Sequence, residues 1–372
     1  MKIGGPTVRL LICAGGTGGG IYPALAVHSA LTSKRANVET LWVGGEYGME
    51  ADLVKRANIP FAAIPAAGVH GVGLRALPNN LLKLASGVVA AHRILRSFRP
   101  DVLFFTGGYV AAPMAFAGWR IPTMLYVPDI EPALALKVLS LFADSITVTA
   151  ETSRKFFTHP RRIHVTGYPL RADLSTWSRE KAIQRFGISR DLPTLLIFGG
   201  SKGAHSINMA ALKFINDLLE IAQVIHVSGS LDWPVVEKTM NELPAHLKAR
   251  YHAMPYLHDM GIAYTIADLV VSRAGASTLG EFPLFGLPAI LVPYPYSWHY
   301  QKVNADYLAE RGAAILLQDE MLESELFSTV KTLLENPTKR ESMRRAMQIL
   351  SHTNAAYDIA DQLLELAGEK SL

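Results

Sequence analysis

The chain has 372 residues, of which 49% are hydrophobic and 18% charged, and its formal net charge is +4. This composition excludes an intrinsically disordered chain, and the length predicts two domains. The charge is compatible with an anionic ligand or an acidic membrane surface and is too small to indicate nucleic acid. The single cysteine, Cys13, excludes a disulfide framework and a cysteine-based zinc site. Since no signal peptide and no apolar run of about 20 residues is recognisable, we expect a cytosolic protein.

Apolar, β-branched runs alternate with helical patterns in the first half of the chain. Strands are expected at Val8–Ala14, Val38–Val43, Asp101–Thr106, Pro122–Val127, Ser145–Thr149 and Ile163–Thr166. Helices are expected around Tyr22–Leu31, Met49–Ala57, Asn79–Ser97 and Pro132–Leu141. This alternation predicts a parallel sheet with crossover helices.

The alternation restarts after the polar stretch Arg171–Asp191. The second set of strands is expected at Thr194–Phe198, Gln223–Val227, Arg250–Ala253, Asp268–Ser272, Pro288–Pro293 and Ala313–Leu316. We therefore predict an α/β fold with two doubly wound, Rossmann-like domains, at 1–168 and 191–350, joined by a linker at 169–190. The C-terminal segment 351–372 is expected to be a helix that packs outside or crosses back to the first domain. Such domains bind ligands at the carboxyl ends of their strands, in a crevice between them.

Glycine-rich turns follow the first strand of each half. They span Gly15–Gly20 and Gly199–Ala204, and each opens a helix. Free backbone N–H groups and the positive end of a helix dipole suit a phosphate there. The first turn matches the dinucleotide fingerprint poorly, because no acidic residue ends the second strand. It is not a P-loop, because no Gly-Lys-Ser/Thr sequence follows it. Gly107-Gly108-Tyr109 is either a third glycine loop of the site or a plain tight turn.

The segment Ser272–Glu281 is the sharpest motif of the chain. A strand ends in a small-residue turn, and a helix begins near Ser277, an arrangement that suits a diphosphate. Glu281 either accepts hydrogen bonds from two ribose hydroxyls or only complements the helix dipole. Gln301 opens a later helix and is within reach of a sugar hydroxyl. The sequence shows no metal-ligand spacing, so we predict no metal and no cofactor.

The stretch Leu74–Arg99 is a leucine-rich helical pattern flanked by basic residues. It is either an ordinary crossover helix or a surface that docks on anionic lipid headgroups, with arginines such as Arg93 and Arg96 at its rim.

Taken together, these motifs resemble the MurG family of glycosyltransferases, which have the GT-B fold. The resemblance covers nearly the whole chain. It rests on Gly15–Gly19 with Pro23–Ala26, Met49–Val54, Pro100–Val102, Gly107–Val110, Gly199–Ala204, Arg273–Glu281, Gly286–Ala289 and Gln301.

The resemblance implies transfer of N-acetylglucosamine from UDP to a lipid-diphosphate-linked N-acetylmuramyl-pentapeptide in peptidoglycan synthesis. The reaction inverts the anomeric centre, needs no metal and takes place peripherally at the cytoplasmic face of the cell membrane. Arg171 and Ser201 match diphosphate contacts, Leu257 matches a uracil contact and Gln301 matches a sugar contact. The diphosphate and ribose loop corresponds to Ala276, Ser277, Thr278, Leu279, Gly280 and Glu281. The sugar and acceptor side is expected to include Thr17, Gly18, Gly19, Gly107, Gly108 and Tyr109.

The acceptor side departs from the family pattern at two places. Gly20 stands where the family has histidine, and Tyr126-Val127-Pro128-Asp129 replaces a His-Glu-Gln-Asn stretch. Attack by a sugar hydroxyl needs a base, for which Asp129 is our candidate and Glu131 the substitute. Asp129 is equally well placed to cap the following helix. Three alternatives remain: a transferase with another acceptor, a UDP-sugar 2-epimerase, and a non-catalytic homologue that binds a UDP-sugar.

Overall fold

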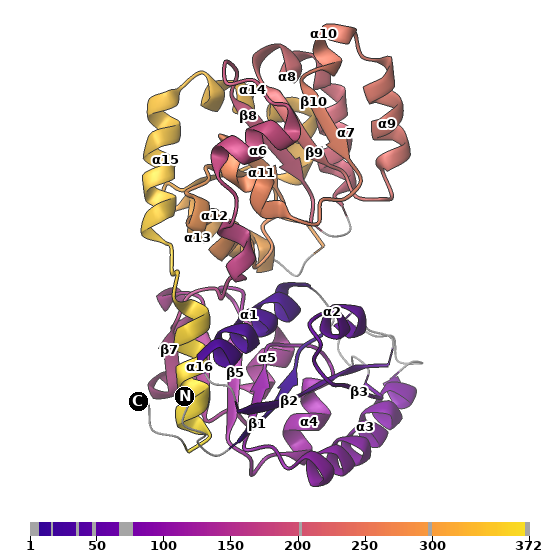
Figure 1. Cartoon of the computed structure of the whole chain (residues 1–372), viewed down its shortest axis with the longest axis vertical. Coiled ribbons are helices and arrows are strands. Elements are labelled where there is room, and N and C mark those ends of the chain that lie inside the picture. The colour runs from indigo at the N-terminus through magenta and orange to yellow at the C-terminus, as the bar shows by residue number, and fades with distance from the viewer. Residues whose placement is uncertain are drawn as a thin grey trace. The chain divides into compact units, whose positions relative to one another are not determined.

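The computed structural model describes residues 7–15, 18–34, 37–46, 50–66, 77–200, 203–296 and 300–368. Contacts divide the chain into two compact units (Figure 1). Unit 1 comprises Met1–Arg171 and His352–Leu372, and unit 2 comprises Ala172–Ser351.

Unit 1 is built on a parallel sheet with the strand order β3-β2-β1-β4-β5-β6-β7. Its strands are β1 (Val8–Cys13), β2 (Val38–Gly45), β3 (Phe61–Ile64), β4 (Val102–Phe105), β5 (Thr123–Val127), β6 (Ser145–Val148) and β7 (Ile163–Val165). Its α-helices are α1 (Gly18–Lys34), α2 (Glu50–Arg56), α3 (Leu77–Phe98), α4 (Ala111–Ala117), α5 (Leu134–Leu139) and α16 (Ala355–Leu366). Short 3₁₀ turns lie at Glu151–Phe156 and Pro160–Arg162.

Unit 2 has a second parallel sheet, with the order β10-β9-β8-β11-β12-β13. Its strands are β8 (Thr194–Phe198), β9 (Gln223–Val227), β10 (Tyr251–Met254), β11 (Leu269–Ser272), β12 (Ala289–Leu291) and β13 (Ala314–Leu316). Its helices are α6 (Arg179–Phe186), α7 (His205–Lys213), α8 (Ile215–Ile221), α9 (Trp233–Glu242), α10 (Ala245–Lys248), α11 (Met260–Ile266), α12 (Thr278–Phe285), α13 (Tyr300–Ala309), α14 (Leu322–Leu334) and α15 (Pro337–Ile349). 3₁₀ turns lie at Ala172–Ser175 and Asp319–Met321.

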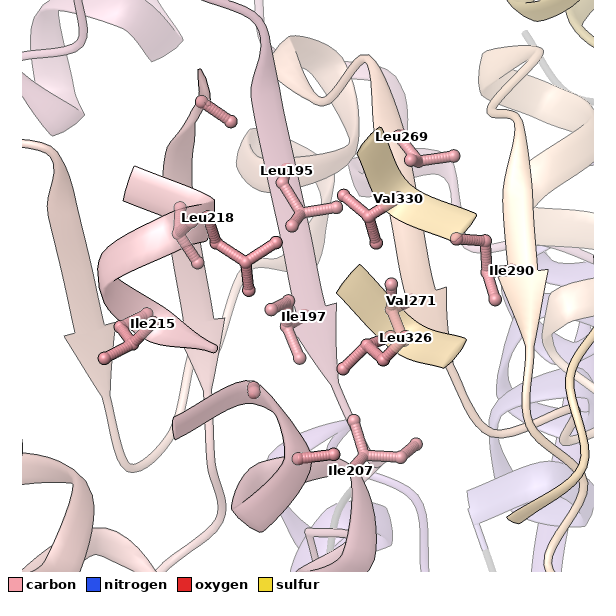
Figure 2. Packing of buried hydrophobic residues seen from close by; sticks show 14 of the residues in the cluster. Leu195, Ile197, Ile207, Ile215, Leu218, Leu269, Val271, Ile290, Leu326 and Val330 are labelled. Atoms are coloured by element: carbon pink, nitrogen blue, oxygen red, sulfur yellow. The ribbon is translucent and has the colours of Figure 1, made fainter. Parts of the chain in front are cut away.

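The core of unit 2 shows why most residues of its strands are apolar. Leu195 and Ile197 are two residues apart on β8, so their side chains lie on the same face of the sheet. Figure 2 shows them beside Leu326 and Val330 of α14, and these side chains belong to one buried cluster. Since helices cover both faces of such a sheet, near-continuous apolar runs predict its strands well.

The predicted fold class is confirmed, and the expected strands are found within one or two residues. In unit 1, strand β3 and helix α4 were not predicted. The segment 169–190, expected as a linker, contains α6, whose Ser178 side chain accepts a hydrogen bond from the Lys181 N–H and whose end is the left-handed Gly187. Helix α6 packs on α11 within unit 2.

The C-terminal helix α16 packs against α1 within unit 1, as Figure 1 shows in yellow and indigo. Lys34 at the end of α1 forms an ion pair with Asp361, 2.5 Å between Nζ and Oδ2. The Lys34 ammonium also lies 5.4 Å from the centre of the Tyr357 ring. The last segment of the chain thus completes the first unit rather than the second.

Candidate functional site

In unit 2, the two predicted phosphate turns follow neighbouring strands at the centre of the sheet. Strand β8 pairs with β9 on one side and with β11 on the other, so the order of the strands reverses there. Doubly wound sheets bind ligands at the carboxyl edge of this switch point. The structure therefore brings the turn after β8 and the turn after β11 to one edge. Of the first turn, the predicted contact Ser201 lies outside the described residues.

Two glycines in these turns have open space in front of their Cα atoms. A Cβ added to Gly200 or to Gly275 would meet no atom of the described residues within 4 Å. At Gly203, by contrast, a Cβ would lie 2.4 Å from the Ser228 carbonyl oxygen. Gly203 is thus needed for packing between the turn and the loop after β9. Gly200 and Gly275 leave backbone exposed to an approaching anion.

Helix α12 begins at the end of the second turn, as the sequence predicted. The Thr278 N–H and hydroxyl both donate to the Gly275 carbonyl, over 3.0 and 2.7 Å. Ala276, Leu279 and Gly280 are buried beside Thr278, while Ser277 is half-buried. The predicted diphosphate loop thus leads directly into the first turn of α12.

Glu281 is half-buried and is held by a tyrosine of another helix. The Tyr264 hydroxyl, on α11, donates a hydrogen bond of 2.8 Å to Glu281 Oε2. The Tyr264 ring is itself buried among Phe198, Phe282 and Phe285. The carboxylate of Glu281 is thus oriented by a partner from another helix. Tyr264 could not be identified from the sequence, because its spacing from Glu281 fits no local pattern.

Arg273 ties together the elements that surround the second turn. Its guanidinium pairs with Asp319, donates to Ser206 Oγ over 2.7 Å and to the Val292 carbonyl over 3.2 Å. The arginine side chain is only 10% exposed. It therefore connects α7, the end of β12 and the turn Asp319–Met321, a function that the motif alone did not reveal.

Gln301 shapes the loop after β12. Its Oε1 accepts a hydrogen bond of 2.9 Å from the Tyr294 N–H. One turn further along α13, the buried Asn304 donates from Nδ2 to the Ala274 carbonyl over 3.1 Å. Both side chains thus fix loops at the carboxyl edge of the sheet. Leu257, the predicted uracil contact, is half-buried in the segment that follows β10.

A buried polar network supports the loop after β9. Asn208 donates to the Ser228 carbonyl over 2.8 Å and to Asp232 over 2.7 Å. Its Oδ1 lies 2.9 Å from Nε2 of His226, whose Nδ1 lies 2.7 Å from the Tyr251 hydroxyl. Burial lowers the pKa of His226 to about 4, against the opposing effect of the Asp232 charge. His226 is therefore neutral at pH 7.

In unit 1, glycine turns also flank the switch point, which lies between β1 and β4. A Cβ at Gly108 would lie 3.2 Å from both N and O of Gly15, so the two turns touch. Gly18 and Gly19 are half-buried at the start of α1, and Tyr109 is exposed. Thr17 lies outside the described residues.

The residues at the positions that depart from the family pattern pack closely against their neighbours in the fold. A Cβ at Gly20 would lie 3.2 Å from the Thr106 carbonyl oxygen, and Thr106 Oγ1 donates to the Gly20 carbonyl over 2.7 Å. Tyr126 and Val127 are completely buried within the sheet. Burial raises the pKa of Tyr126 well above its ordinary value, so it remains a neutral phenol.

Asp129 is half-buried just after β5. The backbone before it is fixed, because Thr149 Oγ1 donates to the Pro128 carbonyl over 2.8 Å and also bonds to the Tyr126 hydroxyl. The N-cap position of α5 belongs to Ala133, so Asp129 is not the N-cap residue that the alternative interpretation required. Glu131 accepts a hydrogen bond of 3.0 Å from Lys137.

The structure groups Arg171 with unit 1, apart from the other predicted diphosphate contacts. Its guanidinium lies 4.9 Å from the centre of the Tyr22 ring, on α1. Among the described residues of unit 2, the predicted donor contacts therefore run from Leu257 to Gln301.

Apolar side chains are exposed on three helices of unit 1 that pack in series, α3 with α4 and α4 with α5. They are Leu82 and Val89 of α3, Phe116 and Trp119 in and after α4, and Leu134, Val138, Leu141 and Phe142 in and after α5. We call these eight side chains the apolar surface of unit 1. On α3, Gly87, Ala91 and Leu95 are buried, so this helix is both a packed crossover and part of the apolar surface.

Within the described part of the chain, no helix is long and apolar enough to cross a membrane. No group of three or more histidine, cysteine, aspartate or glutamate side chains is placed to hold a metal ion among those same residues.

Solved structures and curated proteins resemble the chain over nearly its full length. MurG from Acinetobacter baumannii superposes with a TM-score of 0.76 at 27% identity, covering 97% of this chain and all of that one. A UDP-GlcNAc 2-epimerase from Neisseria meningitidis, solved with UDP-GlcNAc, gives a TM-score of 0.67 at 14% identity over 96% of this chain and all of that one. At that identity the epimerase shows a shared fold and nothing more.

Two curated relatives are named UDP-N-acetylglucosamine--N-acetylmuramyl-(pentapeptide) pyrophosphoryl-undecaprenol N-acetylglucosamine transferase. The protein from Desulforamulus reducens is 40% identical, covering 95% of this chain and 97% of its own length. The protein from Roseiflexus sp. is 37% identical, covering 95% and 94%. The models for the glycosyltransferase family 28 N-terminal and C-terminal domains match residues 10–148 and 194–363. The chain therefore belongs to glycosyltransferase family 28, and the family and GT-B fold predicted from its motifs are confirmed.

Proposed function

We propose that this protein transfers N-acetylglucosamine from UDP to a lipid-diphosphate-linked N-acetylmuramyl-pentapeptide. The observation that carries the proposal is the turn from Gly275 to Glu281, an open backbone that leads into a helix and ends on an oriented carboxylate. The names of the relatives supply the donor and the acceptor.

On this proposal, unit 2 binds the donor. The diphosphate lies against the backbone near Gly200 and Gly275, where the helix starts of α7 and α12 stabilise the charge that develops on the departing UDP. Glu281 accepts hydrogen bonds from the ribose hydroxyls, and Gln301 lies on the sugar side. No protein-bound metal is needed for this step, because backbone dipoles supply the positive potential.

Unit 1 binds the acceptor at the turns after β1 and β4. Asp129 is the proposed base, which removes the proton from the attacking sugar hydroxyl as the bond to the anomeric carbon forms. Its position at the carboxyl end of β5 supports this assignment, as does the fixed backbone of Pro128 before it.

We also propose that the protein works peripherally at an anionic membrane surface. The apolar surface of unit 1 adjoins exposed basic side chains, among them Lys83, Arg93, Arg96 and Arg120. The combination of exposed apolar residues with basic neighbours is typical of proteins that lie on anionic lipid. A lipid-linked acceptor requires such a location.

The direct test is incubation with UDP-N-acetylglucosamine and a synthetic lipid-linked N-acetylmuramyl-pentapeptide, with mass spectrometry of the lipid product. The disaccharide product is expected. UDP release without disaccharide would indicate hydrolysis or another acceptor. The second candidate, a non-catalytic UDP-sugar-binding protein, is favoured by the burial of Tyr126 and Val127, and it predicts UDP binding without turnover.

A further inference from the structure

Glu50 is a buried acid that none of the preceding assignments uses. It is the first residue of α2, is 1% exposed, and lies at the carboxyl ends of β1 and β2. Two glycines make room for it. A Cβ at Gly15 would lie 2.6 Å from Glu50 Oε1, and a Cβ at Gly44 would lie 2.8 Å from Glu50 Cγ.

The two carboxylate oxygens of Glu50 differ in their partners. Oε1 accepts a hydrogen bond of 2.9 Å from the Gly45 N–H, which closes the loop between β2 and α2. Oε2 is also buried, and among the described residues it has no hydrogen-bond partner. Burying a carboxylate oxygen without a hydrogen-bond donor is costly. Such an atom therefore indicates a hydrogen-bond partner outside the described residues.

The place of Glu50 indicates what that partner is. Its carboxylate packs against Gly15, and Gly15 in turn touches Gly108 in the turn after β4. These turns flank the switch point of the unit 1 sheet, where doubly wound domains bind their ligands. The unpaired oxygen therefore lies beside the expected ligand position and away from the outer surface of the fold.

We propose that Glu50 Oε2 accepts a hydrogen bond from a hydroxyl group of the sugar acceptor, which makes Glu50 an acceptor-binding residue. This rests on the proposed function, in which unit 1 takes the acceptor. Because Oε2 is shielded from solvent, the sugar reaches it only when neighbouring backbone shifts. Glycine at position 15 allows such a shift at the lowest steric cost.

The test compares Glu50→Gln with Asp52→Asn in the full chain. Both substitutions remove one negative charge from the first turn of α2, but Asp52 is exposed. In Glu50→Gln, the amide oxygen still accepts from the Gly45 N–H, and an NH₂ group replaces Oε2. Binding of a detergent-solubilised lipid-linked N-acetylmuramyl-pentapeptide and binding of UDP are measured separately by calorimetry, and thermal unfolding is followed in parallel.

We expect acceptor binding about 10-fold weaker in Glu50→Gln, as befits the loss of one charge-assisted hydrogen bond. UDP binding and the unfolding temperature should match the wild type, and Asp52→Asn should match it throughout. Acceptor affinity within twofold of the wild type in Glu50→Gln overturns the proposal. So does a parallel loss of acceptor binding, UDP binding and thermal stability, which marks a structural acid.

Failure of the proposed function gives a different pattern. If the wild-type protein binds UDP but does not bind this acceptor, the proposed identity of the acceptor is refuted. The proposed hydrogen bond from the acceptor to Glu50 is then refuted as well. A wild type that binds both, with a Glu50→Gln variant that does the same, refutes only the assignment of Glu50.

Discussion

The hydrogen bond between Tyr264 and Glu281 allows the most direct test of the donor site. Glu281→Ala removes two acceptor oxygens, which leaves the ribose hydroxyls without their partners. Loss of hydrogen bonds to a charged group costs about 1–3 kcal/mol, so UDP should bind roughly 5- to 150-fold more weakly. Glu310→Ala, an exposed acid at the end of α13, is the matched control.

Tyr264→Phe probes the same contact from the other side. The variant keeps the ring among Phe198, Phe282 and Phe285 but removes the hydroxyl that donates to Glu281. With one orienting hydrogen bond lost, we expect UDP affinity to fall by about 1 kcal/mol, or roughly fivefold.

The double variant decides whether the two side chains act together. If Tyr264 acts only by positioning Glu281, then Tyr264→Phe should have no further effect on UDP binding once Glu281 is alanine. Calorimetric titration of UDP into the four proteins gives the coupling free energy directly. Unchanged UDP affinity in Glu281→Ala would refute the ribose assignment. Additive losses in the double variant would refute the positioning by Tyr264.

Three further predictions concern other parts of the chain. The pKa of His226 is about 4 in the folded protein and 6.5 ordinarily, so the unfolded chain takes up the proton at a higher pH than the folded one. The free energy of unfolding should therefore fall by up to about 3 kcal/mol as the pH drops from 6.5 to 4. In denaturant unfolding, the His226→Gln variant should show a weaker pH dependence than the wild type. Arg93→Glu combined with Arg96→Glu should abolish salt-sensitive binding to anionic vesicles, and no sedimentation of the wild type with such vesicles at low salt would contradict the membrane proposal. Asp129→Asn should lower turnover about 100-fold with UDP affinity unchanged; near-normal turnover would exclude Asp129 as the base and shift attention to Glu131.

The fold was predictable wherever the signal is local. Buried parallel strands are short apolar runs, and the glycine turns that follow them mark where helices begin. Strand β3 was missed because it is only four residues long and lies between Pro60 and Pro65 at the edge of the sheet. Helix α4, with the sequence Ala-Ala-Pro-Met-Ala-Phe-Ala, was missed because nearly all its residues are apolar and show no helical periodicity.

The site was predictable in its backbone and not in its side-chain contacts. The turn from Gly275 to Glu281 is a continuous segment, so its residues identify it. Tyr264 and Glu281 meet only because α11 and α12 pack together, and Arg273 meets Asp319 across 46 residues of chain. No spacing rule links such pairs before the fold is known.

This difference explains why the donor side is better defined than the acceptor side. Phosphate recognition uses backbone N–H groups and helix starts, which glycine patterns encode locally. Binding and deprotonating a sugar hydroxyl need single carboxylates, which any strand of the sheet can supply at its carboxyl end. In unit 1, Glu50 follows β2 and Asp129 follows β5, each one strand away from the central pair β1 and β4. If both proposals hold, Glu50→Gln weakens acceptor binding, whereas Asp129→Asn slows turnover and leaves that binding intact. The two carboxylates can therefore be told apart by comparing binding with turnover in the same two variants.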